Sequence, residues 1–81
     1  MNHPIRVPEL GTTEAILTCW FVRPGDHVHE GDRLVELLLG AMTFDISSPV
    51  SGVIIERWTL VDHRVKIGQI LGMVAADDPI F

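Results

Sequence analysis

The sequence has few of the groups with which a small protein can cross-link itself. Cys19 is the only cysteine among 81 residues, so no disulfide can form within the chain and no CxxC pair is present for metal binding or redox chemistry. Stability must therefore come from packing, and a reducing compartment is the simpler environment for such a chain. Apolar residues make up 47% of the composition, which is typical of a folded domain rather than a disordered segment.

Positive charge is also scarce. Lys and Arg total 6 against 11 for Asp and Glu, which gives a net charge of −5, and no basic cluster occurs along the chain. Nucleic acids and anionic membrane surfaces are therefore poor candidates as partners. The first residues contain no apolar run of signal-peptide length, and no later run is long enough to cross a bilayer. We expect a soluble, cytoplasmic protein with a single domain over residues 1–81.

Helical periodicity is missing as well, because no window keeps apolar residues at helical spacing for three turns. Short runs rich in β-forming residues recur instead between Gly, Pro, Asp and Ser. This pattern predicts an all-β protein with Pro8, Pro24 and Pro49 between strands, where a missing amide proton costs no hydrogen bond of a sheet. The expected strands are Ile5 to Val7, Ala15 to Val22, His27 to Val28, Leu34 to Leu39, Met42 to Ile46, Gly52 to Leu60, Arg64 to Val65 and Ile70 to Ala75.

An internal repeat indicates how these strands are arranged. A VxxGxxL pattern occurs twice, at Val28, Gly31 and Leu34 and again at Val65, Gly68 and Leu71. In each copy the valine can point inward, and the glycine can supply a positive φ or allow a close approach. Two halves of this size cannot each bury a sheet face alone, so we expect them to pack around a pseudo-twofold axis. The prediction is a small flattened β-barrel or sandwich of eight short strands.

A two-residue turn at Gly40-Ala41 divides the least polar segment of the chain into two strands. With glycine first, a type II′ turn is expected, and this turn fixes the register of the hairpin. The predicted pairs are Leu39 with Met42, Leu38 with Thr43, Leu37 with Phe44, Glu36 with Asp45 and Val35 with Ile46. Alternation then puts Val35, Leu37, Phe44 and Ile46 on the core face. Glu36 lies opposite Asp45, and two facing negative charges are tolerable only in solvent. Leu38 is then an apolar side chain on the solvent-exposed face.

Four segments cover nearly the whole chain and resemble a known family. They are VPELG at residues 7–11, WFVRPGDHVHEGDRLVEL at 20–37, TFDISSPVSGVI at 43–54 and VKIGQILGMV at 65–74. Their order and spacing resemble the lipoyl/biotinyl attachment domains, which serve as swinging-arm carriers. The resemblance implies two four-stranded antiparallel sheets with pseudo-twofold symmetry, the barrel-sandwich hybrid. VPELG looks more like the lipoyl domains of dihydrolipoyl acyltransferases than like biotin carriers.

The resemblance also implies a site at the tip of the hairpin. In the family a lysine there, commonly in a DKA or MKM turn, is acylated by lipoate or biotin and carries the cofactor between active sites. Counting back from Ser48-Pro49 puts the lysine position on Ala41, with Gly40 at the preceding acidic position. Leu38 occupies another position that is often acidic, and only Met42 matches the biotinyl turn. Because alanine has no nucleophilic nitrogen, no attached cofactor is expected.

Other candidate residues favour structural roles. Lys66, the sole lysine, lies in the second VxxGxxL copy and is expected to be a solvated charge. His27, His29 and His63 could contribute to a zinc site, but two histidines beside a turn are more often solvated, so no metal is expected. Cys19 has no basic neighbour in sequence and is expected to be an inert strand thiol. The remaining candidates are Trp20 and Trp58, for which core or rim packing is expected. No constellation indicates an enzyme.

The tip itself is unusually apolar. Leu38, Leu39 and Met42 surround Gly40-Ala41, where relatives have a charged turn. Two explanations remain open: drift after loss of the lysine, or docking of a protein partner or second copy, since clustered exposed apolar side chains mark contact surfaces. The first functional hypothesis is an unmodified interaction or structural module related to 2-oxoacid dehydrogenase or carboxylase complexes. The second is a true lipoyl or biotinyl carrier in which the lysine was substituted or the modification lies elsewhere.

Overall fold

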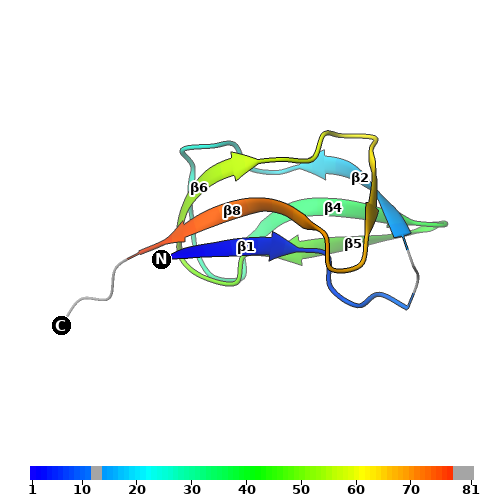
Figure 1. The fold of residues 1–81 in the computed structure, drawn as a ribbon, viewed down its shortest axis with the longest axis horizontal. Helices are drawn as coiled ribbons and strands as arrows, with labels where there is room; N and C mark the ends of the chain where they lie inside the picture. Colours follow the sequence, from blue (N-terminus) through cyan, green and yellow to red (C-terminus); the bar gives the residue numbers. More distant parts are fainter. Residues whose placement is uncertain (12–13, 78–81) are drawn as a thin grey trace.

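The computed structural model describes residues 1–11 and 14–77, and these contain eight β-strands and no helix (Figure 1). The all-β prediction is confirmed. Within the described residues there is accordingly no helix that could span a membrane. The strands are β1 (Asn2–Arg6), β2 (Glu14–Trp20), β3 (His27–Val28), β4 (Arg33–Leu39), β5 (Met42–Ser47), β6 (Gly52–Arg57), β7 (Arg64–Lys66) and β8 (Ile70–Ala76).

Every predicted strand is present, and most ends agree to within two residues; the second strand, for example, ends at Trp20 rather than at Val22. Two strand ends differ by more, for physical reasons. The first strand covers Asn2–Arg6 rather than Ile5 to Val7 and includes Pro4. Proline is tolerated there because β1 is an edge strand, so its missing N–H removes no bond to β8. β6 ends at Arg57 rather than at Leu60, because the chain must turn toward β7 in the other sheet, and Asp62 in that turn has a φ of 70°.

The strands form two antiparallel sheets with the orders β1-β8-β6-β3 and β5-β4-β2-β7. Each strand of the first sheet corresponds to the strand four places further along the chain, with the count continuing from β8 to β1. The strands β1, β8, β6 and β3 thus correspond to β5, β4, β2 and β7. This correspondence is the pseudo-twofold symmetry that the repeat predicted. The two sheets face one another as a sandwich and do not close into a barrel, so the sandwich form of the prediction is the correct one.

The repeated glycines occupy equivalent turns in the two halves. Gly31 has a φ of 92° and Gly68 a φ of 82°, a region that favours glycine. The amide of Gly31 donates to the carbonyl of Ser48 at 2.9 Å, and the amide of Gly68 donates to that of Val7 at 2.8 Å. Each glycine therefore fixes a turn that ties one half of the sandwich to a neighbouring segment.

The core lies between the sheets and draws on both. The valines of the two VxxGxxL copies are buried, as predicted, and the leucines are buried as well. Burial of each such side chain contributes about 1.5–3 kcal/mol to stability. The core side chains are Ile5, Val7, Ala15, Leu17, Val22, Val28, Leu34, Val35, Leu37, Ile46, Ile54, Val65, Leu71 and Val74. This packed centre holds the β4–β5 hairpin so that its tip projects at one end of the molecule, away from the N-terminus (Figure 1).

Candidate functional site

The tip of the β4–β5 hairpin has the predicted geometry. All five predicted cross-strand pairs are present, from Leu39 with Met42 next to the turn to Val35 with Ile46. Gly40 has a φ of 61°. Among the non-glycine residues in the described part of the chain, only Asp62 has a positive φ. Ala41 therefore has a negative φ, which fits a type II′ turn and excludes type I′. Gly40 and Ala41 are both exposed.

The two faces of the hairpin follow the predicted alternation with one exception. Val35, Leu37 and Ile46 are buried, as expected for the core face. Phe44 points to the same side but is 40% exposed, so its assignment to the core was wrong. It lies on the edge strand β5 near the tip, where its side chain is covered only in part.

The facing carboxylates of Glu36 and Asp45 are stabilised by partners rather than by full exposure. Both residues are half-buried. The Thr18 hydroxyl donates a hydrogen bond to Glu36 Oε1 at 2.8 Å, and Arg33 Nη1 lies 3.3 Å from Asp45 Oδ2. Each carboxylate therefore has a polar partner of its own, so the pair is compatible with the register without lying entirely in solvent.

The three apolar residues that flank the turn lie on two faces of the hairpin. Leu38 is on the outer face, where it pairs with Ile16 of β2 and faces Thr43 across the hairpin. Leu39 and Met42 are on the inner face; Leu39 packs against the core, whereas Met42 is 73% exposed. A partner that touched all three would have to grip the tip from both sides. Their contact role stays a prediction.

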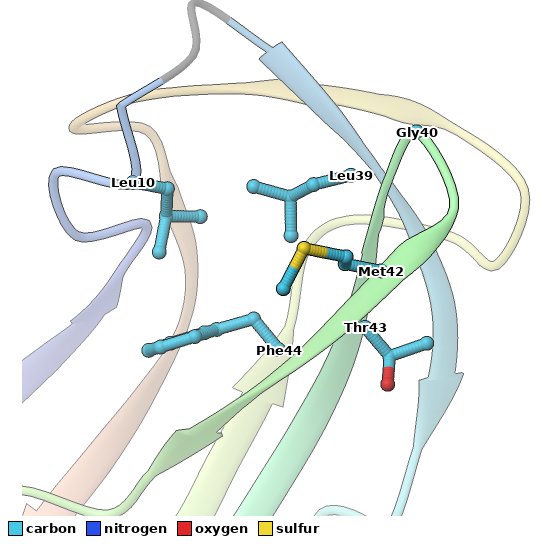
Figure 2. Close-up of a pocket in the computed structure, with 6 residues that line it drawn as sticks. All are labelled: Leu10, Leu39, Gly40, Met42, Thr43 and Phe44. Atoms are coloured by element: carbon cyan, nitrogen blue, oxygen red, sulfur yellow. The ribbon is translucent and has the colours of Figure 1, made fainter.

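An apolar pocket of about 370 Å³ lies between the hairpin and the loop that follows β1. The side chains of Leu10, Leu39, Met42 and Phe44 point toward this space, while Thr43 points away from it (Figure 2). Sequence reasoning missed Leu10 and Phe44 as members of a site. Phe44 could have been found from its place on the inner face, but nothing in the local sequence brings Leu10 to the hairpin. A smaller depression of about 190 Å³ on the outer face is lined by Glu14, Ala15, Ile16, Leu38, Gly40 and Arg64.

The sole lysine is remote from the hairpin. Lys66 is an exposed residue of β7, which forms the opposite edge of the sheet from β5. Its backbone amide donates to Gln69 Oε1 at 3.0 Å, a contact that belongs to the turn before β8. Lys66 therefore cannot present an acyl group from the hairpin tip.

The histidines do not converge on one point. His27 and His29 pack edge to face with ring centroids 5.3 Å apart, and His27 Nε2 lies 3.0 Å from Asp77 Oδ2. His63 belongs to the turn before β7, in the other sheet. Within residues 1–11 and 14–77, no group of three or more His, Cys, Asp or Glu side chains could hold a metal ion.

The remaining candidates have packing roles. Cys19 is half-buried on β2, with its Sγ 3.6 Å from the carbonyl oxygen of Trp20. Trp20 packs against the core, and its Nε1 donates to the carbonyl of Thr59 at 2.8 Å. Trp58 is half-exposed and donates to the carboxylate of Glu56. Trp20 thus belongs to the edge of the core and Trp58 to the surface.

Comparison with known proteins connects this fold and hairpin to one family. The sequence model of the biotin/lipoyl family, described as "Biotin-requiring enzyme", matches residues 3–80. A succinyltransferase component of a 2-oxoglutarate dehydrogenase complex from Bartonella vinsonii subsp. berkhoffii is 37% identical over 94% of this chain and 19% of its own length. An acetyltransferase component of a pyruvate dehydrogenase complex from Corynebacterium glutamicum is 32% identical over 96% of this chain and 12% of its own length. The chain thus spans less than a fifth of these two relatives.

Solved structures show the same fold. The lipoyl domain of the 2-oxoglutarate dehydrogenase complex from Azotobacter vinelandii superimposes with a TM-score of 0.72 at 17% identity, covering 96% of this chain and 99% of that domain. A single-chain, multi-domain long-chain acyl-CoA carboxylase superimposes with a TM-score of 0.82 at 14% identity, covering 96% of this chain and 7% of that protein. The fold of this chain is therefore shared by a lipoyl domain of one complex and by a small part of a multi-domain carboxylase.

Proposed function

Because the chain belongs to the biotin/lipoyl family, we propose that it is a carrier-type domain without an acceptor lysine, which acts unmodified through protein contacts. The observation that carries this proposal is the presence of Ala41 at the exposed second position of the hairpin turn. Covalent attachment of lipoate or biotin requires an amine that can form an amide. A methyl side chain offers none, so the residues at the tip do not fit either cofactor.

The residues that the structure describes offer no substitute for that amine at the tip. Lys66 lies on the opposite edge of the sheet. Arg64 lines the outer depression together with Gly40 and Glu14, and its Nη1 lies 3.7 Å from Oε1 of Glu14. A guanidinium keeps its proton in proteins and is a poor nucleophile. We therefore assign the domain no catalytic or carrier chemistry of its own.

The relatives indicate where such a module would act. The two named above are components of 2-oxoglutarate and pyruvate dehydrogenase complexes. We propose that this domain binds within or beside a complex of this kind, or a carboxylase, and that it contacts its partner through the hairpin end. Leu38, Leu39 and Met42 are the proposed contact residues because they are the apolar side chains closest to the turn.

Intact mass measurement of the protein purified from its natural source tests the proposal. The expected mass is that of the unmodified polypeptide, and added lipoyl or biotinyl mass would establish the alternative, a true carrier. A second experiment exposes Ala41→Lys and the wild type to lipoate and biotin ligases. Because Ala41 is exposed with a negative φ, the variant should fold normally and become acylated, whereas the wild type should remain unmodified.

A further inference from the structure

We propose that the free edge of β5 and the adjoining apolar pocket bind an extended basic segment of a partner protein. The segment would add a strand to the sheet β5-β4-β2-β7 and place one apolar side chain in the pocket lined by Leu10, Leu39, Met42 and Phe44. This inference rests on the proposed function, because it specifies how the hairpin end contacts a partner. Strand addition of this type draws affinity from main-chain hydrogen bonds and specificity from side-chain pockets.

The first observation is the unprotected edge. β5 is the outermost strand of its sheet, and Met42, Thr43 and Phe44 are all exposed. Protein edges are usually blunted by lysine, proline or a bulge that bends the strand away. Met42–Ser47 contains no lysine and no proline, and its pairing with β4 is regular from Met42 to Ile46. The edge is therefore regular over the five residues from Met42 to Ile46, which is long enough to accept another strand.

The turn geometry shows which backbone groups are free. In a two-residue hairpin the pair next to the turn, here Leu39 and Met42, is hydrogen-bonded. Hydrogen-bonded and non-hydrogen-bonded pairs alternate along an antiparallel ladder. The next pair, Leu38 with Thr43, is therefore non-hydrogen-bonded, so the N–H and C=O of Thr43 point away from β4. The same alternation directs the N–H and C=O of Asp45 outward.

The second observation is that the pocket adjoins this edge on the inner face. Met42 and Phe44 are alternate residues of β5, and both point into the pocket together with Leu10 and Leu39 (Figure 2). Side chains of a strand paired with β5 would also alternate between the two faces. Every second side chain of the added strand would thus point to the pocket side, and one bulky apolar side chain would reach the space of about 370 Å³.

Charge favours a basic partner over a second copy of this chain. Residues 7–22 and 34–56, which supply the pocket and most of the hairpin, contain no lysine or arginine. Arg33, at the start of β4, is paired with Asp45 at 3.3 Å, and Arg64 on the outer face is paired with Glu14 at 3.7 Å. Glu9 lies next to Leu10 and is exposed. A second copy would bring another net charge of −5 to this surface, whereas a segment with arginine or lysine beside its apolar anchor would be attracted to it.

An NMR titration with defined peptides tests the inference. The probe is a blocked hexapeptide in which leucine and threonine alternate between arginine ends. One control replaces the leucines by serine, and another replaces the arginines by glutamate. We expect the probe to shift the amide signals of Thr43, Asp45 and Leu10, and both controls to bind more weakly. The serine control should lose about tenfold or more, because burying a leucine contributes that much.

A matched pair of variants tests the backbone contact. Thr43→Pro removes the outward N–H while leaving the bonds to β4 intact, as is tolerated on an edge strand. It should weaken probe binding about threefold to tenfold, the worth of one hydrogen bond. Thr43→Ala keeps the donor and should bind as the wild type does. Dispersed amide spectra will show that both variants fold.

Several outcomes would overturn the inference: no shifts, shifts on another surface, equal binding of the serine control, or equal binding by the two variants. Light scattering that shows a dimer disrupted by Thr43→Pro would identify a second copy as the occupant and also overturn it. These results are separable from the proposed function. Added cofactor mass would refute the proposed function while leaving peptide binding intact. Absence of peptide binding would refute only the proposed binding site at the β5 edge and its pocket.

Discussion

Replacing Gly40 by alanine tests whether the hairpin tip depends on a conformation that glycine adopts at little cost. Gly40 has a φ of 61° as the first residue of the turn. Beyond its own residue and its two chain neighbours, a Cβ added there would meet no atom within 4 Å. Crowding against the rest of the protein therefore contributes nothing, and the cost comes from the local backbone conformation, about 1–3 kcal/mol for a non-glycine residue in such a region.

That cost is a large part of the stability of a domain this small. At roughly 0.05–0.15 kcal/mol per residue, a chain of 81 residues has a free energy of unfolding of about 4–12 kcal/mol. Each kcal/mol lowers the midpoint of thermal unfolding by about 4–8 °C. Gly40→Ala should therefore lower that midpoint by at least several degrees while leaving the core unchanged.

Urea unfolding of Gly40→Ala beside Ala41→Ser gives a matched comparison. Ala41 is exposed in the same turn but has a negative φ, so its substitution should change the free energy of unfolding by about 0.5 kcal/mol or less. If Gly40→Ala lowers the free energy of unfolding by no more than Ala41→Ser does, the type II′ assignment is wrong. The placement of residue 41 at the second position of the turn would then have to be abandoned.

Two further predictions concern the scaffold. Gly52→Ala should lower the free energy of unfolding by about 3 kcal/mol or more, or prevent folding, because the added Cβ would lie 2.0 Å from the backbone carbonyl oxygen of Ala75 in β8. A loss below about 1 kcal/mol in urea unfolding would contradict this close approach. Leu17→Ala should cost about 2–5 kcal/mol, because Leu17 is fully buried. Ile16→Ala, on the half-exposed outer face of the same strand, should cost about 1 kcal/mol or less, and equal losses would contradict the assigned faces.

The hairpin was predictable because its register depends on local information. A two-residue turn with glycine first fixes which residues face one another, and a shift by one residue would move every apolar side chain to the wrong face. The pairs from Leu39 with Met42 to Val35 with Ile46 followed from that constraint. The repeat of Val28, Gly31 and Leu34 was similarly informative, since each copy specifies one turn and the strand that follows it.

The pocket was not predictable because it depends on where one sheet stops covering the other. Alternation showed that Phe44 points inward, but only the tertiary structure shows that its side chain stays 40% exposed on the edge strand β5. Leu10 reaches the same space from a loop far away in the sequence. The start of β1 was missed for a related reason, since Pro4 is acceptable only once β1 is known to be an edge strand.

The pseudo-twofold symmetry explains how the tip can change its chemistry without affecting the fold. Under the correspondence of the two sheets, β4 and β5 are equivalent to β8 and β1. The counterpart of the Gly40-Ala41 turn is therefore the pair of strand ends at Met1 and Ala76, where the amide of Ala76 donates to the carbonyl of Met1 at 2.9 Å. The equivalent strands β8 and β1 therefore pair at this place without a turn between them.

The side chain of residue 41 thus supports nothing in the scaffold, provided that Gly40 lets the chain reverse direction. Neither the core nor the repeated glycine turns include residue 41, so a substitution there is expected to leave both unchanged. Under the proposed function, loss of the acceptor amine removes carrier chemistry and leaves the edge of β5 and its pocket available for binding. Ala41→Lys should consequently restore the acceptor without changing the free energy of unfolding by more than about 0.5 kcal/mol, because the fold and the acceptor chemistry depend on different residues.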